Sequence, residues 1–120
     1  MSVTVGVIGL GPMGGNIAGN LLKNQFEVVG FDILPGRMTA LDGLGLKKAD
    51  SVTAVAERAD VLIASLPNAS ALTNVVEGVL AHAQPGQILI ECSTLAVDQK
   101  LVAHEQIARD GSTRFPEFPQ

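Results

Sequence analysis

The chain has 120 residues, of which 47% are hydrophobic and 17% are charged. This length allows one domain with a substantial core and not two. The formal net charge of −4 excludes the basic face that nucleic-acid binding requires. No apolar run reaches the roughly 18 residues that span a bilayer, and the N-terminus lacks a charged start and cleavage site. We therefore expect a cytoplasmic protein with neither nucleic acid nor a membrane as partner.

The residue usage indicates the kind of core. Trp and Tyr are absent and there are only four Phe, so Ala, Val, Ile and Leu must fill the interior. This usage is typical of a parallel sheet covered by helices. The single cysteine, Cys92, cannot form an internal disulfide, which agrees with a reducing compartment.

The first predicted element is a strand over Val3–Ile8, which runs directly into Gly9-x-Gly11-x-x-Gly14. In this context Gly9 allows a tight turn, Gly11 lets a pyrophosphate approach the backbone, and Gly14 lets a helix pack closely on the sheet. The bound group is an anion, because unpaired backbone N–H groups and the positive end of the helix dipole meet there. Taken alone, the pattern also fits a glycine-rich turn that binds nothing.

The first helix follows this turn. Pro12 stands at an early helical position, where its missing N–H costs nothing. Met13, Ile17 and Leu21 recur at a spacing of four and predict the face that packs on the sheet. Residues 23–25, Lys-Asn-Gln, end the helix.

Asp32 follows a second predicted strand, Phe26–Phe31. It lies 18 residues after Gly14 (32 − 14), where a dinucleotide-binding fold places the acid that binds the adenosine ribose. A carboxylate accepts hydrogen bonds from both ribose hydroxyls and repels a 2′-phosphate, which favours NAD over NADP. Arg37, five positions further on, either reaches such a phosphate or is a solvated side chain in the next helix.

Helices and strands continue to alternate along the rest of the chain. In order, we expect a helix from Pro35 that carries Met38 and Leu41 and stops at Gly43 and Gly45, a short strand over 46–49, a helix over 52–58 capped by Asp50 or Ser51, a strand over 60–65, a helix over 69–82 capped by Asn68 or Ser70, a strand over 87–91 and a helix over 97–108.

This alternation predicts parallel strands joined by right-handed crossovers, and hence a Rossmann-type doubly wound sheet. Ligands of such sheets bind at the carboxyl ends of the strands. That edge then gathers residues 9–14, Asp32, residues 65–68 and residues 92–94 around one crevice.

Four patterns together resemble the β-hydroxyacid dehydrogenase family, which includes 3-hydroxyisobutyrate dehydrogenase, tartronate semialdehyde reductase and the N-terminal part of 6-phosphogluconate dehydrogenase. They are Gly9-Leu10-Gly11-Pro12-Met13-Gly14, Phe31-Asp32, Leu66-Pro67 and Glu91-Cys92-Ser93-Thr94. The resemblance covers nearly all of residues 3–112, and we assign residues 1–112 to one NAD(P)-binding domain. It implies hydride transfer between NAD(P) and a small β-hydroxyacid.

The resemblance also implies roles for single residues. Residues 9–14 bind the dinucleotide, and the backbone at Leu66-Pro67 contacts its ribose region. Thr94 lies against the nicotinamide end, and Ser93 faces the substrate carboxylate. On spacing alone, Ser93 and Thr94 fit equally well as the cap of the last helix.

The chain departs from the family at three places. Ala71 stands where similar proteins have an Asn, and Val97 stands where they have a Pro. Family members continue into a helical domain that supplies a catalytic Lys and an Asn, whereas residues 113–120 of this chain form an atypical tail. Because the tail holds two Pro, we exclude it from the predicted sheet.

Hydride transfer to a carbonyl needs a proton donor, and the sequence offers no catalytic residue for this role. We place Lys100 on the solvent side of its helix. His82 and His104 have no partner at a metal-site or triad spacing, and Cys92 is expected to pack as a small side chain. We therefore predict a chain that binds cofactor but does not turn over substrate alone.

Two other functional classes stay open on the sequence. The chain is alternatively a non-catalytic NAD-binding or protein-interaction module. A methyltransferase using S-adenosylmethionine is disfavoured, because Gly14 and Leu66-Pro67 have no role in one. The sequence does not give the oligomeric state, and apolar surface left bare without a second domain is compatible with a homo-oligomer.

Overall fold

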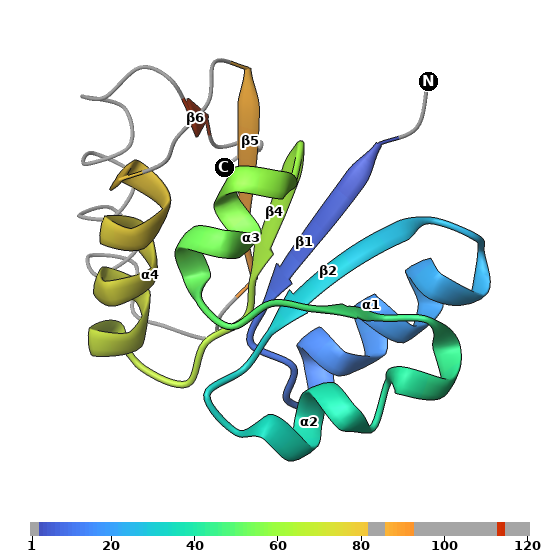
Figure 1. Cartoon of the computed structure of the whole chain (residues 1–120). Helices are drawn as coiled ribbons and strands as arrows, with labels where there is room; N and C mark the ends of the chain where they lie inside the picture. Colours follow the sequence, from blue (N-terminus) through green and yellow to red (C-terminus); the bar gives the residue numbers. More distant parts are fainter. Residues whose placement is uncertain (1–2, 82–85, 93–112, 115–120) are drawn as a thin grey trace.

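A computed structural model describes residues 3–81, 86–92 and 113–114 (Figure 1). These residues form a six-stranded, wholly parallel sheet in the order β3-β2-β1-β4-β5-β6. The elements are β1 (Thr4–Ile8), α1 (Pro12–Lys23), β2 (Glu27–Phe31), α2 (Pro35–Thr39), the 3₁₀ turn η1 (Asp42–Leu44), β3 (Lys47–Lys48), α3 (Val52–Arg58), β4 (Val61–Ala64), α4 (Ala69–Ala81), β5 (Gln87–Glu91) and β6 (Thr113–Arg114). The strand order confirms the predicted Rossmann-type doubly wound sheet.

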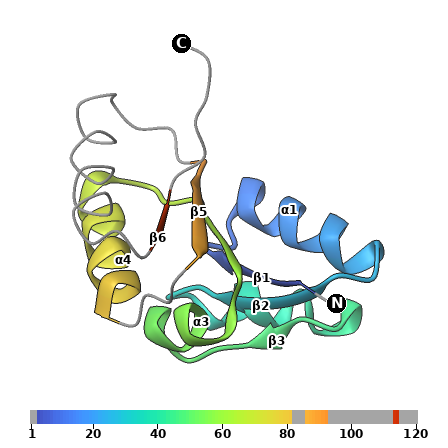
Figure 2. The same ribbon diagram turned by 90° about the horizontal axis from the view of Figure 1, so that it is seen from above.

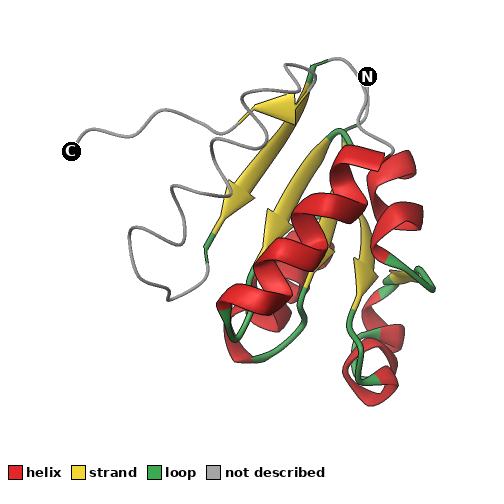
Figure 3. Cartoon of the chain, turned by 90° about the vertical axis from the view of Figure 1, so that its left-hand side faces the viewer, coloured by secondary structure: helices red, strands yellow, loops and turns green. Residues whose placement is uncertain are grey.

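Helices cover both faces of this sheet. α1 lies on one face and α3 on the other (Figure 2), and the helix ribbons of α3 and α4 pack in front of the strands in the side view (Figure 3). Side chains alternate between the two faces along a strand. On β1, Val5 and Val7 accordingly join the cluster beneath α1, whereas Ile8 joins the cluster beneath α3 and α4. The central strand is therefore apolar at successive positions because both of its faces are buried.

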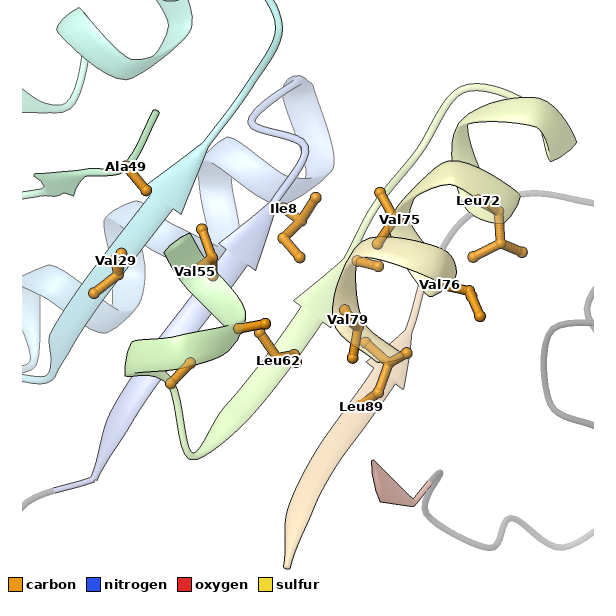
Figure 4. Close-up of a cluster of buried hydrophobic side chains, with 13 residues drawn as sticks. Ile8, Val29, Ala49, Val55, Leu62, Leu72, Val75, Val76, Val79 and Leu89 are labelled. Atoms are coloured by element: carbon orange, nitrogen blue, oxygen red, sulfur yellow. The ribbon is translucent and has the colours of Figure 1, made fainter. Parts of the chain in front are cut away.

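The larger of the two clusters lies between the sheet and helices α3 and α4 (Figure 4). It is almost wholly aliphatic, as the composition predicts. Its largest members are Ile8, Val29, Val55, Leu62, Leu72, Val75, Val76, Val79 and Leu89, and each is at most 4% exposed. This cluster fixes α3 and α4 against one face of the sheet.

Two helix caps resolve alternatives that the sequence left open. The Ser51 hydroxyl accepts a hydrogen bond from the Ala54 N–H at 3.1 Å, so Ser51 rather than Asp50 caps α3. The Asn68 side-chain oxygen accepts from the Ala71 N–H at 2.9 Å at the start of α4. Both are the usual contacts of an N-cap side chain.

The predicted inner face of α1 is confirmed only in part, because Leu21 packs against the core but Met13 does not. The buried residues of this helix are Gly14, Ala18 and Gly19, whereas Met13 is 48% exposed. Hydrophobic spacing selected the larger side chains, but the helix lies so close to the sheet that small residues occupy the contact. Met13 is thereby free to contribute to the cavity described below.

Three other elements differ from their expected bounds. The second helix divides into α2 and η1, and the third strand shortens to Lys47–Lys48 between buried Leu46 and Ala49. The expectation that the tail from Thr113 lies outside the sheet is wrong for its first two residues, because Thr113 and Arg114 pair with β5. The predicted helix over 97–108 and residues 115–120 lie outside the described residues.

Candidate cofactor site

A cavity of about 780 Å³ opens where the central strands end. Residues from the carboxyl ends of β1, β2, β4 and β5 meet around it, as the parallel topology requires. The strand order reverses between β1 and β4, and ligands of doubly wound sheets bind at such a reversal. The lining residues are Ile8, Gly9, Gly11, Pro12, Met13, Phe31, Asp32, Ile33, Leu34, Arg37, Val52, Ser65, Leu66, Pro67, Asn68, Ala71, Asn74, Val75 and Cys92.

The glycine turn shapes one wall. Gly9 has a φ of 90°, which disfavours any residue with a side chain, and a Cβ there would also overlap the Ser65 carbonyl oxygen. A Cβ on Gly14 would overlap the carbonyl oxygen of Gly9. Both glycines are therefore required by the close approach of β1, α1 and the end of β4.

The amino end of α1 faces this wall without a competing side chain. The helix begins at Pro12, its N-cap is Gly11, no side chain caps it, and no acidic residue stands in its first turn. Unpaired N–H groups and the positive helix end suit an anion such as a pyrophosphate. The residues present thus fit the phosphate bridge of a dinucleotide.

Asp32 occupies the predicted position at the end of β2. It is only 6% exposed, and its carboxylate accepts hydrogen bonds from the backbone N–H groups of Leu10, at 2.7 Å, and Leu34, at 2.8 Å. The carboxylate therefore ties the glycine turn to the loop after β2. Each carboxylate oxygen accepts more than one hydrogen bond, so capacity for ribose hydroxyls remains.

Arg37 is neither fully solvated nor buried. Its Nη1 lies 3.5 Å from Oδ2 of Asp32, and its side chain is 46% exposed. The same nitrogen would be 3.4 Å from a Cβ on Gly11, so the guanidinium lies directly beside the glycine turn. Arg37 therefore lines the cavity beside Asp32, and whether it meets a phosphate there stays a prediction.

The opposite wall comes from the segment after β4 and from the end of β5. Leu66 and Pro67 line the cavity together with Ser65 and Cys92. The Cys92 N–H donates to the Ala64 carbonyl at 2.9 Å, which holds the end of β5 beside that of β4. Segments that are distant in the sequence are thus brought to one crevice as predicted.

Not every predicted site residue has its side chain in the cavity. Leu10 is buried beneath α1, and its contribution is the N–H that Asp32 accepts. Gly14 is buried against Gly9 and acts by lacking a side chain. Ser93 and Thr94 lie outside the described residues.

The sequence did not single out several residues on the cavity wall. Ile33, Leu34, Val52, Asn74 and Val75 all contribute to it. Ile33 and Leu34 could have been suspected from the sequence, because two large apolar residues in a loop directly after Asp32 indicate a surface that contacts a ligand or partner. The other three come from the amino-terminal halves of α3 and α4, and only the three-dimensional fold shows this.

Of the side chains considered above for catalysis or metal binding, Cys92 lines the cavity. Lys100, His82 and His104 lie outside the described residues. Within residues 3–81, 86–92 and 113–114, no group of three His, Cys, Asp or Glu side chains forms a metal site. In the same part of the chain, no helix is long and apolar enough to cross a membrane.

Several known proteins resemble this chain in sequence, and others resemble it in fold. The family described as the NAD binding domain of 6-phosphogluconate dehydrogenase matches residues 4–116. A 3-hydroxyisobutyrate dehydrogenase of Pseudomonas aeruginosa is 35% identical over 112 residues, 91% of this chain and 38% of that protein. An NAD-dependent L-serine dehydrogenase of the same species is 36% identical over 95 residues, 77% of this chain and 32% of that protein.

The structural comparison leads to the same group. A 3-hydroxyisobutyrate dehydrogenase of Mycobacterium tuberculosis superposes with a TM-score of 0.88 at 29% identity, over 96% of this chain and 39% of that one. The chain thus spans 30–40% of the length of these relatives and corresponds to their cofactor-binding domain. It belongs to the family of NAD-binding domains found in 6-phosphogluconate dehydrogenase and the β-hydroxyacid dehydrogenases typified by 3-hydroxyisobutyrate dehydrogenase.

Proposed function

We propose that this chain binds NAD in preference to NADP, as the cofactor-binding part of an enzyme that transfers hydride between NAD and a small β-hydroxyacid. The observation that carries this preference is the buried carboxylate of Asp32 on the cavity wall. It accepts ribose hydroxyls and repels a 2′-phosphate. The relative named as an NAD-dependent L-serine dehydrogenase supports the same choice.

The cofactor's phosphate bridge lies over Gly9 and Gly11, against the amino end of α1. Pro12 and Met13 flank the bridge, while Leu10 and Gly14 hold the turn in shape. Arg37 lies beside the adenosine end and adds positive charge near the phosphates. The lining of the cavity and the contacts of Asp32 support these assignments.

The nicotinamide half extends along Leu66 and Pro67 toward the end of β5. By the family resemblance, Thr94 lies against the nicotinamide and Ser93 faces the substrate carboxylate. When bound, the cofactor supplies the hydride chemistry, and the residues of this chain bind and orient it. Chemistry also needs a proton donor, and no Lys or His side chain is on the described cavity wall. We therefore expect this chain alone not to oxidise 3-hydroxyisobutyrate or glycerate.

We further propose that the protein is located in the cytoplasm.

The test is calorimetric titration of the 120-residue chain with NADH and with NADPH, for the native chain and for Asp32→Asn. Loss of the charged acceptor should weaken the binding of NADH by roughly tenfold or more, whereas the binding of NADPH should weaken less or become tighter. The ratio of the two affinities is the readout, because Asp32 also anchors two loops and its substitution affects both cofactors through the fold.

Asp42→Asn is the matched control, since Asp42 is an exposed carboxylate paired with Lys48 away from the cavity. Its affinity ratio should equal that of the native chain. A native chain that binds both cofactors equally would overturn the preference for NAD. Stabilisation by NAD with no turnover of any β-hydroxyacid, even with the helical domain of a relative supplied, would favour the non-catalytic module.

A further inference from the structure

The cavity wall includes four large apolar side chains, Ile33, Leu34, Val52 and Val75, which together are named the apolar compartment. Ile33 and Leu34, which follow Asp32, are 82% and 51% exposed although both are large and apolar. Val52 and Val75 line the same cavity from α3 and α4. A planar ring bound against these side chains would bury the exposed surface of Ile33 and Leu34. If the ribose is held at Asp32, the base attached to that ribose reaches this compartment.

The same cavity is lined by one polar side chain of α4, Asn74. This residue is exposed. Gly78, on the same face of α4, lies against Val52, since a Cβ there would be 2.9 Å from the Val52 Cγ1. Asn74 precedes Gly78 by four residues and so lies one helical turn from this contact. The Asn74 amide makes no hydrogen bond to another described side chain or backbone group, whereas the neighbouring Asn68 oxygen already caps α4.

We infer that Asn74 reads the edge of the adenine ring, so that the site recognises the base as well as the phosphates and ribose. A side-chain amide offers one acceptor and one donor side by side, and adenine offers an N6–H donor beside a ring-nitrogen acceptor. The apolar walls hold the ring, and the amide selects the base. This inference rests on the proposed binding of NAD.

The experiment compares NAD with 1,N6-etheno-NAD, in which a two-carbon bridge joins N1 and N6 of the base and removes the N6–H. Both ligands are titrated calorimetrically into the 120-residue chain and into Asn74→Ala, Asn74→Leu and Thr73→Ala. The Leu variant keeps the bulk of Asn74 and lacks its amide. Thr73 is the neighbouring exposed residue of α4 and is absent from the cavity wall, which makes it the matched control.

The native chain and Thr73→Ala should bind NAD roughly fivefold or more tightly than the etheno derivative. Both Asn74 variants should bring the two affinities to near equality, through weaker binding of NAD. If Asn74→Leu keeps the native ratio, the etheno group is excluded by bulk, and the inference is wrong. If Asn74→Ala still binds NAD but keeps the native ratio of affinities for NAD and the etheno derivative, the inference is also wrong. Failure of the native chain to bind NAD at all would instead overturn the proposed function on which the inference rests.

Discussion

Gly14 shows how much one residue determines at the cofactor site. It is the position at which α1 passes the end of β1, and a Cβ there would overlap the Gly9 carbonyl. Gly14→Ala should therefore push the helix away from the turn and lower the free energy of unfolding by about 1–3 kcal/mol. Thermal unfolding and calorimetric titration with NAD measure the two effects.

Gly43→Ala is the control for this substitution, because a Cβ at Gly43 meets nothing within 4 Å. It should leave NAD affinity unchanged and stability within about 0.5 kcal/mol of the native chain. Equal behaviour of the two alanine variants would contradict the role of Gly14. The glycine turn was predictable from the sequence pattern, and at Gly9 and Gly14 the structure supplies a steric reason for it.

Glu27 provides a pH-dependent contact between β2 and the edge strand. Its Oε1 lies 2.6 Å from Nζ of Lys47, and this ion pair lowers the pKa of Glu27 below its ordinary value of 4.5. Since the folded pKa is depressed, the contribution to stability is present above about pH 4.5 and disappears as the pH falls through the folded pKa. Glu27→Gln should lower the melting temperature at pH 7 slightly and leave it unchanged near pH 2.

Melting curves at the two pH values test this prediction. Glu77→Gln is the comparison, because Glu77 is an exposed residue of α4 with no ion pair to another described side chain. A Glu27→Gln deficit that persists unchanged at pH 2 would show that the ion pair is not its cause. Contacts of this kind were not predictable, since the register of β2 with β3 decides which charges meet.

At the scale of elements, Gln87 joins the start of β5 to the end of α3. Its buried Nε2 donates to the carbonyl oxygens of Ala56 and Ala59, at 2.7 and 2.9 Å. Those carbonyls belong to the last turn and the C-cap of α3, where the helix itself supplies no donor. Gln87→Met keeps the length of the side chain and removes the donor, so it should cost about 1–3 kcal/mol of unfolding free energy.

Chemical denaturation measures this cost, and Thr73→Ala, on the exposed side of α4, should stay within about 0.5 kcal/mol of the native chain. NAD affinity should be unaffected, because Gln87 is absent from the cavity wall. A stability loss in Gln87→Met no greater than in the control would refute the capping role.

Element prediction succeeded where a local signal was strong and failed where packing decided. α3 begins and ends at the predicted residues because Ser51 caps it and an extended Ala59 follows it. The inner face of α1 was predicted only in part: Leu21 packs on the core, but Ala18 and the glycines, rather than Met13, are the buried residues. β6 was missed because it is only two residues long and forms by pairing with β5. So short a segment has no strand pattern of its own, and the prolines that follow it argue against a strand.

At the scale of the whole molecule, cofactor and fold should stabilise one another. Because the cavity joins the ends of β1, β2, β4 and β5, a ligand there connects most of the sheet and binds the folded state alone. NAD at 100 times its dissociation constant should add about 2.7 kcal/mol to the free energy of unfolding. Denaturation with and without NAD measures the gain, and free nicotinamide at equal concentration is the control. No gain from NAD would contradict cofactor binding at this cavity.

The global arrangement was predictable in outline. Alternating strands and helices with a glycine turn after the first strand left the doubly wound sheet as the natural topology, and this placed Asp32 and Leu66-Pro67 at one edge. The walls beyond Asp32 were not predictable, because Val52 and Asn74 reach the cavity only through the packing of α3 and α4 on the sheet.

The edge strand β3 bears on how the molecule behaves at high concentration. It is only two residues long, and both Lys47 and Lys48 are exposed. A sheet margin offers unpaired backbone groups to any other extended peptide, and short, cationic margins discourage that recruitment. On this side the protein should resist ordered, amyloid-like stacking, and replacing both lysines by valine should remove the protection.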